Sequence, residues 1–368
     1  MVTPPGVARP LRLLPFRALT LAPSRIGDPA AIRSMTRPYR TAASRLARWE
    51  KAGQLSHDDQ PAVYLHEYTA SGVTVRGLVG ALDLSRPAHA GEETAVLPHE
   101  GIHPDQVDEL AERMLQMQIN PAPILLVHRG PADVRDLLID VRRRPPQRTF
   151  IDHGAQQHRI WTVTDPGELA SISSALAPGR ALLADGHHRY AAYVRMRQLQ
   201  PGPATDAGLA MLIDQEDTPL QLGAIHRVLE RTTLDALRSA ADRADITWRP
   251  VDAATALEHL AEDLLLATDG SEWITLQAEV RPDRTAVEAL HEDLLTGFTT
   301  APRSIGFHHH VDAALGAVRG RSSVAVLMPA PDFEQVCRVA GSRLLPEKAT
   351  SFQPKPNDGA LIRSLRDE

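Results

Sequence analysis

The chain has 368 residues, of which 43% are hydrophobic and 23% charged, so it can fold on its own as two or three domains or as one elaborated α/β domain. The formal net charge of -6 does not favour a nucleic-acid partner, which needs a basic face, and the single cysteine excludes a disulfide framework and a cysteine-based zinc site. Since no apolar run is as long as a membrane span or a signal-peptide core, we expect a cytoplasmic protein without membrane contacts.

Hydrophobic periodicity and turn residues predict alternating strands and helices up to residue 200. The predicted elements are, in order, helix 39–52, strands 62–68 and 73–84, helix 104–118, strand 124–128, helix 131–144, strands 149–151 and 159–163, helix 166–176, strand 181–184 and helix 188–200. Because hairpins occur among the helices, we expect an α+β or mixed α/β fold with mixed sheets, and not a doubly wound parallel sheet.

The pattern continues to residue 345 and then becomes irregular. The predicted elements are strands 209–213 and 220–229, helices 234–244 and 254–264, strand 273–278, helices 285–295 and 311–318, strand 323–328 and helix 332–340. We therefore predict three regions: residues 1–200, a C-terminal α/β region over 201–345, and a tail over 346–368 that folds back on the functional site.

The strongest functional signal is the segment from Asp185 to Arg189, which lies between a predicted buried strand and a predicted helix. Gly186 permits a sharp turn, so that the first amides of the helix and the positive end of its dipole point at one place. His187, His188 and Arg189 add positive charge there, and arginine offers a fork of donors that suits phosphate. The segment therefore predicts a site for an anion.

Other interpretations of this segment are structural or metal-binding. Asp185 could simply cap the helix while the histidines and the arginine are solvated. It could also hold a histidine in one tautomer, or help to place Mg²⁺ beside bound phosphates. A zinc site from His187 and His188 is disfavoured because adjacent side chains on a helix diverge, and no organic cofactor is predicted.

Residues 182–190, Leu-Leu-Ala-Asp-Gly-His-His-Arg-Tyr, resemble the central motif of a bacterial and archaeal family, the domain of unknown function family 1015. Other stretches resemble further motifs of the family in the same order, so that the resemblance covers nearly the whole chain. These stretches are 14–19, 46–55, 61–64, 99–100, 120–124, 158–161, 226–228 and 346–355.

Two positions depart from that family. The family usually has Pro-Pro-Tyr-Asp-Val near its N-terminus, where this chain has Pro38-Tyr39-Arg40 and no aspartate after the tyrosine. A glutamate often follows the central tyrosine of the family, whereas Ala191 stands there in this chain. This chain therefore lacks both acids.

The central motif is also similar, more distantly, to the Gly-x-x-Arg turn of the ParB and sulfiredoxin-like fold, which includes nucleotide-binding ParB proteins and kinases of free serine. The resemblance implies a ParB/sulfiredoxin-like core around residues 181–200. It also implies phosphoryl transfer from ATP, ADP or pyrophosphate to a small hydroxyl compound, with free L-serine as the first candidate. This implication rests on an analogy between folds.

On that interpretation the candidate residues have three roles. The residues expected to contact phosphate are Gly186, His187, His188, Arg189, Lys348 and Lys355. The residues expected in catalysis are Glu100, as the base for the substrate hydroxyl, with His99, Asp185 and His188. The residues expected to contact substrate are Asn120, Tyr190 and Arg227.

Several of these side chains also have ordinary structural explanations. His99 and Glu100 could form a solvated turn, and lysines in a Pro-rich tail are usually solvated. Asn120 could cap a turn instead of binding substrate, and Arg227 could pair with a surface acid.

Histidines outside the central motif have weaker functional signals. The run from His308 to His310 resembles a metal-binding tract, but only alternate members of a strand or loop share a face, so a solvated helix start is the preferred interpretation. His153 and His158 are expected to be structural or to lie at the rim of the cleft.

Three functions remain open on the sequence. The first is a small-molecule kinase, which predicts product from serine and a phosphate donor with Mg²⁺. The second is a non-catalytic ParB-like nucleotide-binding switch, which predicts binding without transfer. The third is an inactive relative that serves as a regulator or scaffold, and the two missing acids favour it.

Overall fold

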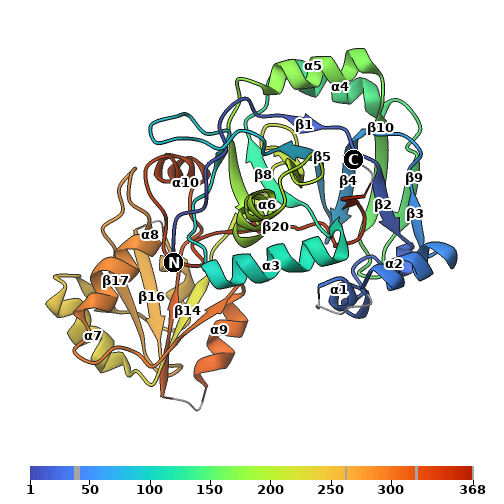
Figure 1. Ribbon diagram of the computed structural model, residues 1–368. Helices are drawn as coiled ribbons and strands as arrows, with labels where there is room; N and C mark the ends of the chain where they lie inside the picture. The colour runs from blue at the N-terminus through green and yellow to red at the C-terminus, as the bar shows by residue number, and fades with distance from the viewer. Residues whose placement is uncertain (37–41, 262, 320–321, 367–368) are drawn as a thin grey trace. The chain divides into compact units, whose positions relative to one another are not determined.

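The computed structural model describes residues 1–36, 42–261, 263–319 and 322–366. The chain forms two compact units, one of Met1–Leu220 with Pro354–Glu368 and one of Gln221–Gln353 (Figure 1). The sequence predicted divisions near residues 200 and 345, whereas the contacts divide the chain after residues 220 and 353. The altered segment at residues 38–40 lies outside the described residues.

The first unit is built on a mixed sheet, which has nine strands among the described residues. Its order is β6-β11-β8-β12-β5-β4-β10-β9, and β1 pairs with β5. Helix α3 packs against α6, which contacts β8 and β12, while α5 packs against α4, which contacts β10 (Figure 1). A smaller sheet of order β3-β2-β21-β7 brings the end of the chain, β21, against strands from its first 120 residues.

The bounds of the elements of the first unit follow. The strands are β1 Leu13–Leu14, β2 Ala18–Leu21, β3 Leu55–His57, β4 Val63–Ala70, β5 Val73–Asp83, β6 Val96–Leu97, β7 Ile119–Asn120, β8 Ile124–His128, β9 Arg148–Ile151, β10 Gln157–Val163, β11 Ala181–Asp185, β12 Ala207–Asp214 and β21 Ile362–Ser364. The helices are η1 Pro23–Arg25, α1 Pro29–Thr36, α2 Ala42–Lys51, α3 Pro104–Met117, α4 Ala132–Arg142, α5 Pro166–Leu176 and α6 His187–Leu199.

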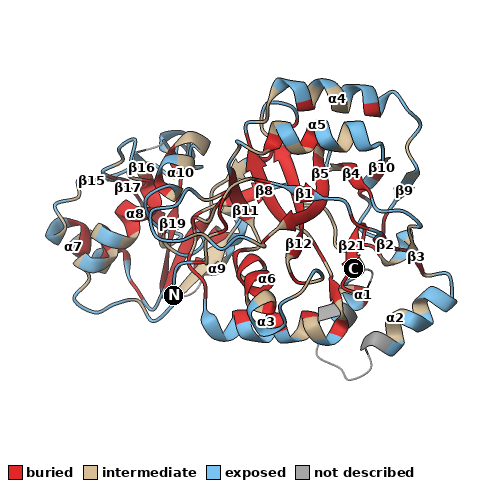
Figure 2. Cartoon of the chain, turned by 45° about the horizontal axis from the view of Figure 1, so that its top comes forward, coloured by how far each residue is buried: buried red, intermediate tan, exposed pale blue. Residues whose placement is uncertain are grey.

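The core of the first unit lies between its central sheet and helices α3, α4, α5 and α6. The central strands β8 and β12 are buried almost along their whole length. In α3 the buried residues Val107, Ala111 and Met114 recur every three or four positions and form one apolar stripe. Figure 2 shows the same division, with buried residues on the strands and exposed residues on the outer faces of the helices.

The second unit is built on an antiparallel sheet of order β15-β17-β16-β19-β14-β18. Helix α9 packs Ala314 and Val318 against Val228 and Leu327 of this sheet. A separate two-stranded ribbon pairs β13, the first strand of the unit, with β20, the last.

The bounds of the elements of the second unit follow. The strands are β13 Gln221–Gly223, β14 His226–Glu230, β15 Trp248–Pro250, β16 Leu264–Thr268, β17 Trp273–Gln277, β18 Ile305–His308, β19 Ser323–Leu327 and β20 Ser351–Gln353. The helices are α7 Leu234–Arg243, η2 Ala256–His259, α8 Ala286–Glu288, η3 Ala289–Leu294, η4 Leu295–Gly297, α9 Val311–Val318 and α10 Phe333–Ala340.

The observed fold is the predicted mixed α+β class. The prediction of a helix over 254–264 is wrong, because the short 3-10 helix η2 is followed by the buried strand β16. The predicted strand 220–229 is two strands, β13 and β14, which belong to different sheets. No helix in the described parts of the chain has both the length and the apolar character needed to cross a membrane.

The predicted strand, glycine turn and helix around residue 186 are present as β11, Gly186 and α6. Gly186 has φ 92° and ψ 34°, a left-handed conformation that L side chains rarely adopt. A Cβ added there would lie 3.1 Å from Cγ2 of Ile124, the first residue of β8. Backbone conformation and packing therefore both require glycine at the start of α6.

Substitution of Gly186 tests this requirement. We expect Gly186→Ala to lower the free energy of unfolding by about 1–3 kcal/mol, because the new Cβ is both strained and crowded. Gly202→Ala is the matched control, since a Cβ at Gly202 meets no atom within 4 Å. Urea denaturation measures both variants, and equal stability of the two would contradict the requirement.

Candidate functional site

Asp185 follows an irregularity at the end of β11. Leu183 pairs with Leu126 while Asp185 pairs with Leu125, so Ala184 is the extra residue of a β-bulge. A bulge redirects the side chains that follow it. Leu183 is fully buried in the apolar core, whereas Asp185 is only partly buried and lines a cavity.

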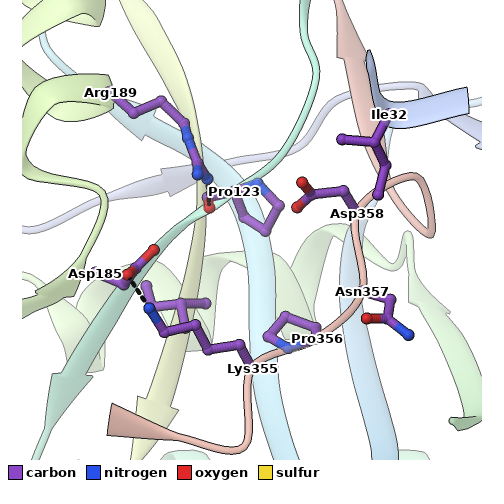
Figure 3. A pocket seen from close by; sticks show the side chains of 9 residues that line it. Ile32, Pro123, Asp185, Arg189, Lys355, Pro356, Asn357 and Asp358 are labelled. Atoms are coloured by element: carbon purple, nitrogen blue, oxygen red, sulfur yellow. Dashed lines mark hydrogen bonds and ion pairs between the residues drawn. The ribbon is translucent and has the colours of Figure 1, made fainter. Parts of the chain in front are cut away.

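That cavity has a volume of about 250 Å³ and lies beside the start of α6 (Figure 3). It is formed by the end of β11, the starts of α6 and β8, helix α1 and the segment before β21. Its lining residues are Ile32, Pro123, Leu125, Asp185, Arg189, Lys355, Pro356, Asn357 and Asp358.

Two cations and two carboxylates face this cavity. The Lys355 ammonium donates to Asp185 in an ion pair, and the Arg189 guanidinium donates to the backbone carbonyl of Pro123. The Lys355 and Asp185 side chains are 41% and 29% exposed, so a ligand can reach both from solvent. Figure 3 shows the Asp358 carboxylate turned toward the same space. The charges of the four side chains sum to zero.

The carboxyl group of Asp358 has a shifted pKa. Burial raises the pKa of this group, and nearby Asp185 raises it further, while Arg189 and Lys355 lower it by less. The net pKa lies above the ordinary aspartate value. Asp358 therefore takes up a proton more readily than a surface aspartate, as a general base must.

The two histidines of the central motif contact a different segment, residues 99–103. His187 Nε2 accepts a hydrogen bond from the backbone N–H of His99 at 3.3 Å. His188 Nε2 accepts from the backbone N–H of His103 at 3.0 Å, and the two rings stack. Because each Nε2 accepts a hydrogen bond, it has no proton of its own. These contacts therefore form with neutral imidazole rings.

The acids and histidines predicted near the motif lie along the same segment. His99 is fully buried, and burial lowers its pKa to about 4 although a hydrogen bond with the backbone of Leu183 opposes the shift. Glu100 stands between His99 and His103, the two residues that contact the first turn of α6. Glu100 lies outside the lining of the 250 Å³ cavity.

The predicted substrate contacts of the first unit are buried away from that cavity. Asn120 is fully buried, and its Oδ1 accepts from the Arg363 guanidinium at 3.0 Å. Tyr190 is fully buried in the apolar core, where burial raises the pKa of its hydroxyl. Asn120 and Tyr190 are therefore buried inside the first unit, and neither side chain lines the cavity.

Arg227 and Lys348 belong to the second unit. Arg227 is fully buried, donates to the backbone carbonyls of Glu347 and Lys348, and lies over the ring of Phe307. Its hydrogen bonds thus join β14 to the segment before β20. Lys348 has φ 56°, a left-handed conformation at the residue whose carbonyl Arg227 binds.

The histidine run belongs partly to a strand that the sequence analysis did not predict. His308 ends β18 and pairs with His226 of β14, while His310 is the N-cap of α9. Among the described residues, no group of three or more histidine, cysteine or acidic side chains is arranged to hold a metal ion.

Sequence analysis missed Pro123, Asn357 and Asp358 as lining residues. Asn357-Asp358-Gly359 is a turn pattern directly after the tail motif, and its carboxylate was the available signal. The sequence analysis assigned Asp185, Arg189 and Lys355 to one site. In the structure these three residues line the same cavity.

The chain belongs to the family described as "Protein of unknown function (DUF1015)", whose family model matches residues 12–294. The matched region includes Asp185 and Arg189 but ends before Lys355 and Asp358. A comparison with curated proteins found no match.

Several solved structures are similar to parts of this chain. A conserved hypothetical protein from Pyrococcus furiosus is 12% identical, with coverage of 74% of this chain and 93% of that one and a TM-score of 0.40. A mutant of a free serine kinase in complex with AMP is 14% identical, with coverage of 79% and 93% and a TM-score of 0.43. SbnI from Staphylococcus aureus, truncated at its C-terminus, is 10% identical, with coverage of 74% and 85% and a TM-score of 0.42.

The buried His99 predicts a loss of stability in acid. Its pKa is about 4 in the folded state and 6.5 when exposed, so the unfolded chain binds the extra proton between these values. Stability is therefore complete above pH 6.5 and falls as the pH approaches 4, by on the order of 3 kcal/mol from this group. His99→Gln should remove this part of the pH dependence, measured as the difference in free energy of unfolding between about pH 7 and about pH 5.

The control for this measurement is His89→Gln, because His89 is exposed and its surroundings change little on unfolding. We expect the control to keep the acid sensitivity of the unsubstituted protein. If His99→Gln keeps it as well, His99 does not contribute to the acid sensitivity.

Proposed function

We propose that the cavity beside the start of α6 binds the phosphate groups of a nucleotide or of pyrophosphate. The observation that carries this proposal is the convergence of Arg189 and Lys355, from distant parts of the chain, on a cavity next to a helix N-terminus. The helix begins at a glycine, which offers no side-chain oxygen to its first amides. Phosphate oxygens are suitable acceptors for these donors.

The charge balance of the cavity indicates that phosphate binds together with a divalent cation. The carboxylates of Asp185 and Asp358 would repel a bare phosphate, but a carboxylate such as that of Asp185 is the kind of oxygen ligand that Mg²⁺ prefers. Such an ion commonly uses one or two carboxylates and completes its shell with phosphate oxygens and water. A bound ion would supply positive charge that neutralises the phosphates. With Asp185 as a ligand of that ion, Lys355 would be available to the phosphate oxygens.

We further propose that the terminal phosphoryl group of the donor is transferred to a small hydroxyl compound, which breaks its bond to the rest of the donor and releases ADP, AMP or phosphate. Free L-serine is the first candidate for the acceptor, from the resemblance of the central motif. Asp358 would accept the hydroxyl proton, because its carboxyl faces the cavity and has a raised pKa. Glu100, the base predicted from the sequence, is the second candidate, since it lies in the segment that contacts the first turn of α6.

The alternative is a ParB-like protein that binds nucleotide without transferring phosphate, as a switch or as an inactive relative. Ala191 favours this alternative, because it is 2% exposed within the apolar core and provides no carboxylate where the family often has one. Both functions require the same phosphate-binding residues, and transfer to serine distinguishes them.

Phosphate binding is tested by calorimetric titration of the full-length protein with ADP, ATP and pyrophosphate, each with and without Mg²⁺. We expect Arg189→Ala and Lys355→Ala to weaken the affinity for the Mg²⁺ complexes by about tenfold or more, because each removes a charged donor. Arg195→Ala is the control, since Arg195 lies on the same helix but pairs with Asp108 at the surface. Equal affinity of Arg189→Ala and Arg195→Ala would contradict the proposal.

Transfer is tested with labelled ATP, ADP or pyrophosphate and free serine as the acceptor. We expect Asp358→Asn to lower the rate of phosphoserine formation by about 100-fold or more while nucleotide still binds, because an amide cannot accept the proton. Glu100→Gln is compared in the same assay to separate the two candidate bases. Binding by the unsubstituted protein without any transfer to serine would support the switch instead.

A further inference from the structure

A buried chain of hydrogen bonds runs from two neighbouring strands toward the cavity. His66 of β4 and His158 of β10 face each other, with 2.9 Å between His66 Nε2 and His158 Nδ1. His158 Nε2 lies 3.0 Å from Oδ2 of Asp152, in the turn between β9 and β10. All three residues are buried, and the proposed function does not use them.

The carboxylate fixes the direction of every hydrogen bond in this chain. Asp152 can only accept, so His158 carries its proton on Nε2 and accepts at Nδ1 from the Nε2–H of His66. Burial lowers the pKa of both histidines, by more than the hydrogen bond to Asp152 raises that of His158. Both rings are therefore neutral, and both donate toward Asp152.

The same carboxylate holds the side chain of Asn357. Asn357 Nδ2 donates to Asp152 Oδ2 at 2.8 Å. The side chain occupies a slot between two glycines, since a Cβ at Gly27 would lie 2.8 Å from Nδ2 and a Cβ at Gly154 only 2.5 Å from it. In Figure 3 the Asn357 amide turns away from the Asp185–Lys355 pair, on the far side of the backbone. Asn357 is thus fixed by an acceptor and by the shape of its slot.

Asn357 belongs to a strap, which we define as residues 354–358. Other residues of the first unit hold the backbone of the strap: Tyr68 donates to the Pro354 carbonyl at 2.6 Å, and Gly27 N–H donates to the Asp358 carbonyl at 3.1 Å. Gln156 donates to the Lys355 carbonyl at 2.9 Å and accepts from the Asn357 N–H at 2.9 Å. Tyr68, Gly27 and Gln156 are not among the residues that line the cavity.

We propose that Asn357, locked by the Asp152–His158–His66 chain, is the positioning residue that fixes the strap so that Lys355 and Asp358 both face the phosphate cavity. Lys355 has a long, flexible side chain and is 41% exposed, so its own ion pair contributes little to its placement. A fixed backbone removes part of the ordering cost that ligand binding would otherwise include. The use of the strap for phosphate rests on the proposed function, whereas its locking by Asp152 does not.

The test exchanges the hydrogen-bond donor and acceptor at positions 152 and 357. Asn357→Asp places a second carboxylate against Asp152, so we expect the strap to detach. In Asp152→Asn/Asn357→Asp the new amide donates to the new carboxylate, and both histidines restore the chain by moving their protons from Nε2 to Nδ1. Exposed Gln198→Glu is the control, because it makes the same amide-to-acid change at the surface of α6.

Two readouts are measured on the full-length protein: amide hydrogen exchange of residues 354–361, and affinity for pyrophosphate with Mg²⁺. We expect Asn357→Asp to speed the exchange by about tenfold or more and to weaken the affinity by a similar factor, while the control changes neither. The double variant should restore both to within about threefold of the original. If Asn357→Asp does not fold, Gly154→Ala replaces it, since the added Cβ displaces Asn357 without a new charge.

Each outcome decides a separate claim. The lock would be overturned if Asn357→Asp leaves the hydrogen exchange of the strap unchanged. It would also be overturned if the double variant folds but its strap exchanges as fast as that of the single variant. Faster exchange with unchanged affinity would overturn the use of the strap for phosphate. If the unsubstituted protein does not bind pyrophosphate, the proposed function fails, and the exchange readout still decides whether Asp152 locks the strap.

Discussion

The ion pair between Asp185 and Lys355 joins the end of a central strand to a segment that follows the whole second unit in the chain. Because both groups are substantially exposed, the pair contributes little to folding stability. Its geometry depends instead on what lies behind each partner. A β-bulge and a left-handed glycine place Asp185, and backbone hydrogen bonds of the strap place Lys355. A weak pair between two rigidly held groups can exchange partners when a charged ligand arrives.

The electrostatic balance of the cavity differs from that of a simple anion cradle. The sequence placed histidines and an arginine at one helix end, which suggested an excess of positive charge. In the structure His187 and His188 accept hydrogen bonds from residues 99–103, and Arg189 and Lys355 are balanced by two carboxylates. On the proposed function, the two carboxylates would favour phosphate bound together with a divalent cation over a free phosphate ion.

Local chemistry explains which features could be predicted from the sequence. The turn at Gly186 follows from an apolar run, a glycine and a helical pattern within a few residues, and it was predicted correctly. Strand β16 was not predicted, and the predicted helix 254–264 reached its first residue, because a short apolar run such as 264–268 is compatible with either structure until its neighbours are known. The Asp185–Lys355 contact had only a resemblance to indicate it.

Long-range contacts explain the features that could not be predicted. Asp358 looks like part of an ordinary surface turn until the fold brings it beside Arg189. The direction of His187 depends on where the backbone of His99 lies, and periodicity contains no such information. The partner of His158 is similarly hidden, because Asp152 is separated from it by a turn whose shape the sequence does not specify.

The position of the second unit within the chain has a consequence for biosynthesis. Residues 221–353 are translated after β11 and α6 but before the strap. The cavity consequently lacks one cation and one carboxylate until the ribosome has passed residue 358, when the nine-stranded sheet and the second unit have already been translated. A nascent chain can thus contain most of the scaffold while half of the charged groups of the cavity are still missing, so this cavity is among the last features that the polypeptide completes.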